Sequence, residues 1–262
     1  TIQYDVGEKG ETLDSAKIKE WLTIGADYSV TLDESKVAGY VQYLASKYNT
    51  YGDVRVFKTS MGDKVKIGGG DYGWVIDKEK EKAQLLSEIS SGKTIKREPV
   101  FNQTAEVKSE TYDIGDTYVE VDYTNQHMYF YENGKLKLET DVVTGNVSRN
   151  NGSPDGVYKI VYKERDATLV GENYASDVNY FMVFAYNVGF HDASWRTDFG
   201  REIYKASGSH GCINMPGNMA EKLYKILPTG TPVIAYYREP VELTAENARI
   251  SNAYSYVKKE ES

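Results

Sequence analysis

The sequence predicts an α+β protein in which a mixed α/β domain over residues 1–109 precedes a mostly β domain over residues 110–240. Two observations support this prediction. Helix and strand patterns alternate in the first part of the chain, whereas strand and turn patterns dominate the second. The chain of 262 residues has the length of one large domain or two ordinary ones. The polar residues 241–262 are expected to form either a helix or a frayed tail.

Three helix patterns in the first domain each begin after an aspartate, which is a preferred N-cap residue. Asp14 precedes a short apolar stripe, and Asp33 precedes a longer one with the spacing of an amphipathic helix. Asp77 begins a third helix that runs to about Ser90 and is ended by Gly92. Short strands are expected at 54–57 and 65–67.

Strand patterns in the second domain begin at 118–123, where apolar and polar residues alternate. Asn133 and Gly134 separate two strand-like runs, which is the strongest short signal for a β-hairpin. Further strands are expected at 157–162, 179–186 and 233–237, with a helix after Pro216.

Composition excludes several classes of function. The chain carries 31 basic and 39 acidic residues, and the net charge of −8 argues against a nucleic-acid partner, which requires a concentrated basic face. The single cysteine excludes an intramolecular disulfide framework and a multi-cysteine zinc finger. No apolar run approaches the roughly 18 residues of a membrane span. The sequence implies no cofactor.

The chain begins at Thr1 rather than at a methionine, so we interpret it as a processed or trimmed product. The lack of a targeting segment therefore leaves the localisation of the full protein open. Any membrane anchor is expected to lie outside these residues.

The only cysteine, Cys212, lies two residues after His210 in a Ser-His-Gly-Cys-Ile-Asn segment. If this segment is extended, both side chains lie on one face, because side chains alternate along a strand. A thiol beside an imidazole is typical of an activated cysteine nucleophile. The N–H groups of Gly211 and Cys212 are candidates for stabilising an oxyanion.

A second histidine, His191, follows the predicted strand at 179–186 and precedes Asp192. It is a candidate general base, with its tautomer fixed by Asp192 or by a backbone carbonyl. An alternative is a zinc ion held by His191, His210 and Cys212 with an open fourth position.

The spacing of these residues resembles the signature of YkuD-type L,D-transpeptidase catalytic domains over about residues 110–240. A histidine is followed, after 17 residues, by the Ser-His-Gly-Cys-Ile-Asn block. Many members have glycine after the first histidine, where this chain has Asp192. The matching positions are His191, Ser209, His210, Gly211, Cys212 and Asn214.

The resemblance implies a sandwich-like catalytic fold and a role in Gram-positive peptidoglycan cross-linking. It implies attack on a tetrapeptide stem, release of the terminal D-Ala, a thioester acyl-enzyme and a 3→3 cross-link to the amine of a second stem. It also implies inactivation by carbapenems and a location outside the cytoplasm, in the cell wall or anchored to the membrane facing the wall. The alternative is an L,D-carboxypeptidase or endopeptidase that uses water as the acceptor.

The resemblance also assigns roles to individual residues. Cys212 is the nucleophile, His191 the general acid/base, and His210 a secondary imidazole. Ser209 is a hydrogen-bonding support, and Asp192 is a candidate for orienting His191. The candidates for contacting substrate are Asp192, Asn214, Trp195, Arg196 and Tyr204, with Tyr186 as a further groove residue.

The first domain weakly resembles the accessory domain, often called peptidoglycan-binding, that precedes such catalytic domains. The segment with this resemblance is Gly-Trp-Val-Ile-Asp at 73–77. A non-catalytic wall-binding module is therefore the alternative for this part of the chain.

Overall fold

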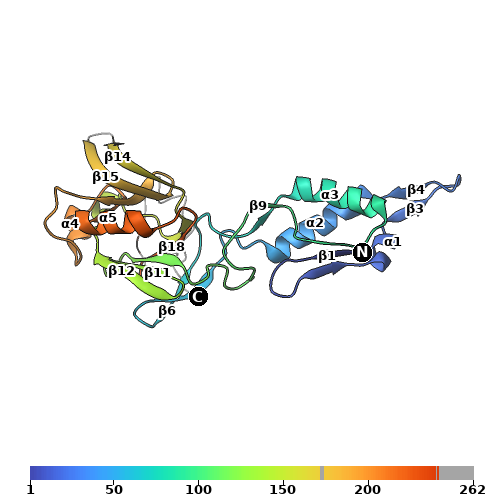
Figure 1. Ribbon diagram of the computed structural model, residues 1–262, viewed down its shortest axis with the longest axis horizontal. Helices are drawn as coiled ribbons and strands as arrows, with labels where there is room; N and C mark the ends of the chain where they lie inside the picture. Colours follow the sequence, from blue (N-terminus) through green and yellow to red (C-terminus); the bar gives the residue numbers. More distant parts are fainter. Residues whose placement is uncertain (172–173, 240, 242–262) are drawn as a thin grey trace, which may run out of the picture. The chain divides into compact units, whose positions relative to one another are not determined.

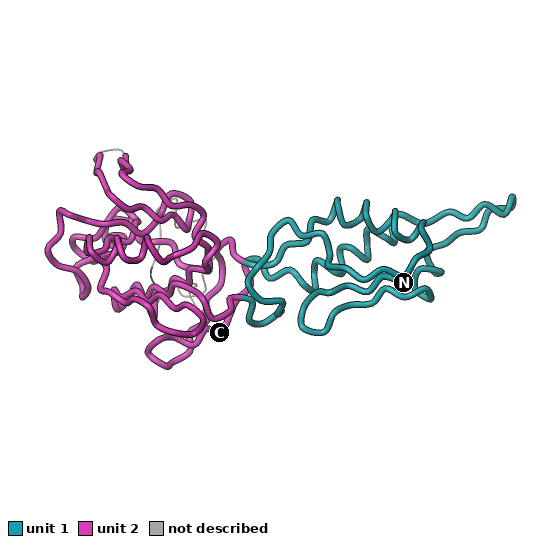
Figure 2. The backbone as a smooth tube through the Cα atoms, in the orientation of Figure 1, with its two compact units in different colours: residues 1–51, 73–113 teal, residues 52–72, 114–262 magenta. Residues whose placement is uncertain are grey.

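The computed structural model describes residues 1–171, 174–239 and 241. The chain forms two compact units, which Figure 2 distinguishes by colour. Unit 1 contains residues 1–51 and 73–113, and unit 2 contains residues 52–72 and the described residues from 114 onward. Among the described residues, no helix has the length and apolarity needed to cross a membrane.

Unit 1 is a mixed α/β unit whose helices begin where the sequence predicts. The side chains of Asp14, Asp33 and Asp77 each accept a backbone N–H of the first turn. Gly92 ends the third helix with a φ of 67°, a left-handed conformation that favours glycine. The helices are α1 (Ser15–Lys19), α2 (Glu34–Tyr48) and α3 (Lys78–Ser91).

The strands of unit 1 form three small sheets (Figure 1). In the largest, β1 pairs antiparallel with β2 and parallel with β8. One side of α2 packs with these strands into a single apolar core, so the helix covers the sheet. The strands are β1 (Ile2–Tyr4), β2 (Glu11–Leu13), β3 (Leu22–Ile24), β4 (Val30–Leu32), β7 (Val75–Ile76), β8 (Ile95–Arg97) and β9 (Phe101–Gln103).

Unit 2 is mostly β and contains two larger sheets. The order of the five-stranded sheet is β12-β11-β10-β18-β13, and that of the four-stranded sheet is β14-β15-β16-β17. The strands are β10 (Tyr118–Asp122), β11 (His127–Glu132), β12 (Lys135–Asp141), β13 (Gly156–Lys159), β14 (Tyr162–Gly171), β15 (Tyr174–Ala185), β16 (Val188–Asp192), β17 (Ile213–Met215) and β18 (Pro232–Tyr236). The helical segments are η1 (Val147–Arg149), α4 (Ile203–Ser207) and α5 (Gly217–Ile226).

The two larger sheets share one hydrophobic core. Val119 and Phe130 enter it from the five-stranded sheet, and Phe184 and Phe190 enter it from the four-stranded sheet. Helix α5 contacts strands of both sheets and adds Leu223 to the core (Figure 1). A mixed α/β unit followed by a mostly β, sandwich-like unit confirms the predicted fold class.

The predicted hairpin is present between β11 and β12. Asn133 and Gly134 have φ angles of 51° and 70°, as the two-residue turn of twisted hairpins requires. The single strand predicted at 157–162 is wrong, because the chain leaves the five-stranded sheet after β13 and enters the four-stranded sheet as β14. Residues 242–262, for which a helix or a tail was expected, lie outside the described residues.

Residues 52–72 were predicted to belong to the first domain, but they lie in unit 2. They contain the hairpin of β5 (Arg55–Lys58) and β6 (Lys64–Ile67). The ring of Phe57 lies 5.5 Å from that of Tyr118, and the N–H of Tyr72 donates to the carbonyl of Val157 at 3.1 Å. These partners are distant in sequence, so local patterns do not reveal them.

A buried carboxylate joins this hairpin to the five-stranded sheet. Glu120 is fully buried and accepts hydrogen bonds from the N–H and hydroxyl of Ser60 and from the hydroxyl of Tyr236 at 2.7 Å. Burial raises the pKa of Glu120. Its stabilising role therefore depends on keeping all of these donors in place.

We expect Glu120→Ala to lower the free energy of unfolding by about 3 kcal/mol, because it leaves several buried donors without an acceptor. The measurement is urea denaturation followed by tryptophan fluorescence. Glu164 is exposed on β14 and provides the control. Equal midpoints for Glu120→Ala and Glu164→Ala would contradict the anchoring role.

Candidate active site

A tight turn between α4 and β17 presents Cys212. The Oγ of Ser209 accepts the N–H of Gly211 at 3.0 Å and donates to the carbonyl of Cys212 at 2.5 Å. The hydroxyl of Ser153 donates to the carbonyl of Gly211 at 2.6 Å and accepts the N–H of Gly145 at 2.9 Å. Two serine hydroxyls therefore fix the backbone that holds the thiol.

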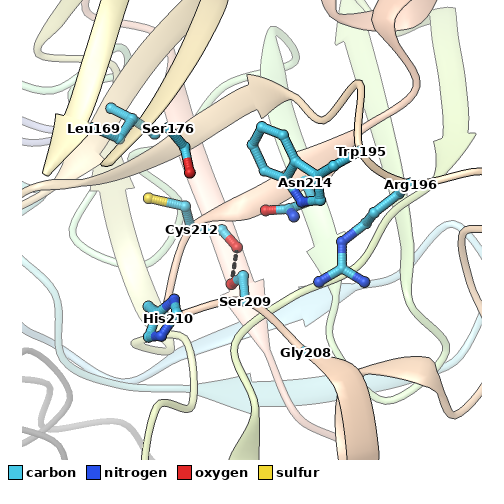
Figure 3. A pocket seen from close by; sticks show the side chains of 9 residues that line it. All are labelled: Leu169, Ser176, Trp195, Arg196, Gly208, Ser209, His210, Cys212 and Asn214. Atoms are coloured by element: carbon cyan, nitrogen blue, oxygen red, sulfur yellow. Dashed lines mark hydrogen bonds between the residues drawn. The ribbon is translucent and has the colours of Figure 1, made fainter. Parts of the chain in front are cut away.

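The segment 210–212 is a bend rather than an extended strand. Gly211 has a φ of 132°, which explains why glycine occupies the position. The alternation argument for placing His210 and Cys212 on one face therefore does not apply. Figure 3 shows the sulfur of Cys212 turned toward Leu169 and Ser176, with the exposed His210 on the other side of the backbone. Both residues nevertheless line one pocket.

Of the two N–H groups predicted to stabilise an oxyanion, that of Gly211 has another partner. The N–H of Gly211 is already donated to Ser209 inside the turn, in a buried position. It is therefore not directed at a ligand in this structure. The N–H of Cys212 remains the candidate donor from the predicted pair.

Strand pairing places His191 near the thiol. His191 is 3% exposed and pairs with Asn214 across the parallel strands β16 and β17. Cys212 lies two residues before Asn214, immediately before β17. The ring of His191 lies 6.2 Å from that of Phe181, and Cys212 packs against the apolar cluster that contains Phe181. His191 and Cys212 therefore both lie next to the apolar cluster that contains Phe181.

The tautomer of His191 is fixed by a backbone carbonyl. Its Nδ1 lies 2.8 Å from the carbonyl oxygen of Asp192, which can only accept, so Nδ1 carries the proton. Nε2 is then the acceptor that a general base needs. The carboxylate of Asp192 is occupied elsewhere, with the N–H groups of Asn179 and Tyr180 both at 2.8 Å. Asp192 therefore orients His191 through its main chain, and its carboxylate braces β15.

Burial sets the resting charge of both reactive groups. Desolvation lowers the pKa of His191, so the imidazole is neutral at neutral pH. Cys212 is half-buried, yet desolvation raises the pKa of its thiol to about 11, against an opposing backbone contact with Gly189. At neutral pH, Cys212 is therefore a thiol and His191 a neutral imidazole, rather than a thiolate and an imidazolium.

A cavity of about 160 Å³ opens at the thiol. Its lining includes several sequence-predicted residues and three that the sequence analysis missed. Leu169 and Ser176, which are cross-strand partners in the β14–β15 hairpin, enter from above Cys212 (Figure 3). Local patterns gave no signal for them, because only tertiary packing brings the hairpin over the turn. The full lining is Leu169, Ser176, Trp195, Arg196, Gly208, Ser209, His210, Cys212 and Asn214.

Three of the residues predicted to contact substrate, Asp192, Tyr204 and Tyr186, do not line this cavity, and neither does His191. The carboxylate of Asp192 is engaged by β15. Tyr204 is 4% exposed within α4, where it is part of the packed interior. Tyr186 is 44% exposed after β15, and its ring lies 6.4 Å from that of Tyr158. Their nearness to the motif in sequence does not translate into nearness to the cavity.

The zinc alternative required three ligands in one cluster. Within the described ranges, no group of three or more His, Cys, Asp or Glu side chains is arranged to hold a metal ion. His191, His210 and Cys212 therefore do not form such a group.

The raised pKa of Cys212 predicts a distinctive alkylation profile. We expect the rate constant with iodoacetamide to rise about tenfold per pH unit from pH 7 to 10, because only the thiolate reacts and the thiol has a pKa of about 11. A cysteine peptide, with a pKa of about 8.5, serves as the control and should level off first. A plateau below pH 8 would instead indicate a thiolate–imidazolium pair.

Family models match both parts of the chain. The L,D-transpeptidase catalytic domain (YkuD) matches residues 116–234, and the family described as "Putative peptidoglycan binding domain" matches residues 2–96. The first match contains His191 and the whole turn from Ser209 to Asn214. No curated protein matches the chain by sequence.

Solved structures match the chain over most of its length. The carbamoyl enzyme that Ldtfm forms with avibactam is 37% identical, with a TM-score of 0.76, over 90% of this chain and 92% of that one. A cysteine-to-serine mutant of the Enterococcus faecium L,D-transpeptidase is 36% identical, with a TM-score of 0.76, over 90% of this chain and 94% of that one. The identity and coverage extend across both units, and the chain therefore belongs to the L,D-transpeptidase family.

Proposed function

We propose that this protein forms 3→3 cross-links in peptidoglycan through a thioester acyl-enzyme on Cys212. The observation that supports this most directly is the strand pairing of β16 with β17. It brings a buried imidazole, whose Nε2 is an acceptor, alongside the strand that directly follows the pocket-lining thiol. A similar chain, Ldtfm, forms a carbamoyl enzyme with avibactam, which is a covalent product of the acyl-transfer type.

The first half-reaction acylates the enzyme. Neutral His191 accepts the thiol proton as the sulfur of Cys212 attacks the carbonyl carbon of the third stem residue. The N–H of Cys212 is the candidate donor for the resulting oxyanion. The imidazolium then gives its proton to the departing nitrogen, so the bond to D-Ala breaks, D-Ala leaves as an amine, and a thioester remains.

The second half-reaction regenerates the thiol. An amine on a neighbouring stem attacks the thioester carbonyl while His191 takes a proton from it. The carbon–sulfur bond breaks, an amide forms, and the proton returns to the sulfur of Cys212. With water as the acceptor, the same steps give a free carboxylate, so the alternative is an L,D-carboxypeptidase or endopeptidase. Product analysis with and without an acceptor amine separates the two activities.

The substrate also suggests a location. Mature peptidoglycan lies outside the cytoplasmic membrane, so we propose that the protein acts there, in the wall or anchored to the membrane facing it. Unit 1, which matches a family described as peptidoglycan-binding, would then hold the polymer for the catalytic unit.

Cys212→Ala should abolish acylation, because no other thiol exists in the chain. Incubation with a disaccharide-tetrapeptide or with a carbapenem is expected to add one acyl group to the wild type and none to the variant. A carbapenem is a suitable probe because a thiolate can open its strained lactam. Intact-mass measurement gives the result directly, and an adduct that persists on Cys212→Ala would falsify the proposed nucleophile.

His191→Ala should slow acylation by roughly 10²- to 10⁴-fold, because it removes the general base. His210→Ala should have a smaller effect, since His210 is exposed and lies on the far side of the turn from the thiol. Single-turnover acylation by a carbapenem measures both variants under identical conditions. A larger loss for His210→Ala would reverse the assignment of the base.

A further inference from the structure

Arg196, which lines the catalytic cavity, has no counter-ion among the residues that the structure describes. Within the described part of the chain, its guanidinium makes no hydrogen bond or ion pair, and its Nε is buried without an acceptor. Other half-buried arginines are neutralised: Arg97 pairs with Glu81 and Glu88, and Arg238 pairs with Asp122. Arg196 is itself half-buried, and a buried donor without an acceptor costs free energy. A ligand that supplies an anion at this place would remove that cost.

The backbone around Arg196 is held firmly next to the reactive groups. The N–H of Arg196 donates to the carbonyl of Ala193 at 3.1 Å, and the N–H of Ala193 donates to Met215 of β17 at 3.1 Å. This turn follows directly after the strand that ends with His191 and Asp192. Figure 3 shows the guanidinium on the same side of the view as Asn214 and Ser209, and all three residues line the cavity.

A second unpartnered atom in the same cavity has the opposite polarity. The Oδ1 of Asn214 is buried and accepts no hydrogen bond from any residue that the structure describes. The site therefore offers a cationic donor and a neutral acceptor near Cys212. A guanidinium binds a carboxylate through two parallel hydrogen bonds, and an amide oxygen accepts an N–H. The terminal residue of a peptide, with its amide N–H and free carboxylate, contains both complementary groups.

We propose that Arg196 binds the free α-carboxylate of the terminal residue of the donor stem, while Asn214 accepts the N–H of that same residue. This inference rests on the proposed function, in which that residue is the one that leaves. It makes Arg196 a specificity residue that selects stems ending directly after the scissile bond. A stem whose terminal residue is amidated, or is followed by another residue, has no free carboxylate on the residue after the scissile bond.

The test compares two tetrapeptide donors that differ only in a terminal carboxylate or a terminal primary amide. We expect the wild type to form the acyl-enzyme roughly 10- to 100-fold faster with the carboxylate donor, the range for a hydrogen bond to a charged group. Arg196→Met should lower the rate for the carboxylate donor to that for the amide donor, and leave the amide donor nearly unchanged. Arg196→Lys keeps the positive charge but cannot donate two parallel hydrogen bonds, so it should retain part of the preference for the carboxylate donor.

Three controls separate recognition from structure. Arg149→Met removes an exposed guanidinium from the same unit and should leave the preference intact. Alkylation by iodoacetamide should proceed equally in the wild type and Arg196→Met, which shows that the thiol is unperturbed. Urea denaturation should show no loss of stability in Arg196→Met, because a purely structural arginine would destabilise the fold when removed.

Two results would overturn the inference and leave the proposed function standing. One is a wild type that accepts both donors at equal rates, and the other is an Arg196→Met variant that slows both donors by the same factor. The absence of acyl-enzyme with either donor on the wild type would instead refute the proposed function and this inference together.

Discussion

The parallel pairing of β16 with β17 is the constraint on which the site depends. It sets His191 beside Asn214 in register and brings the start of β17, which directly follows Cys212, alongside the same strand. A parallel pair needs a long connection between its strands, and here that connection contains Trp195, Arg196, α4 and the serine-fixed turn. The pairing of these two strands therefore positions His191, Cys212 and most of the residues that line the cavity.

Burial then determines the chemistry available at rest. Desolvation lowers the pKa of His191 and raises that of Cys212, so at rest the imidazole is neutral and the thiol is protonated. The carbonyl of Asp192 holds the proton of His191 on Nδ1 and leaves Nε2 as an acceptor. Burial also leaves the Nε of Arg196 without an acceptor among the described residues, and this is the reason for the proposal that the cavity binds an anionic group. The protonation states and the proposed recognition thus have the same physical cause, which is desolvation.

Much of the fold could be predicted because its signals are local. The caps at Asp33 and Asp77, the glycine after α3 and the turn at Asn133 and Gly134 each act within a few residues of the chain. The assignment of residues to the two units could not be predicted from local signals. The 52–72 segment joins unit 2 through Phe57 and Ser60, whose partners lie far along the sequence.

For the site, the sequence by itself determined the residue types: one thiol, two nearby histidines and a serine at a specific spacing. Only the tertiary structure decided how they are used. It bends the segment at Gly211, commits that N–H to Ser209, and assigns the orientation of His191 to a backbone carbonyl instead of the Asp192 carboxylate. Likewise, only the tertiary structure shows the β14–β15 hairpin over Cys212 and the Nε of Arg196, which has no acceptor among the described residues. The physical reason is that these hydrogen bonds and this burial depend on contacts between segments that are distant in sequence. The spacing of residues in a motif gives information only about positions that are close along the chain.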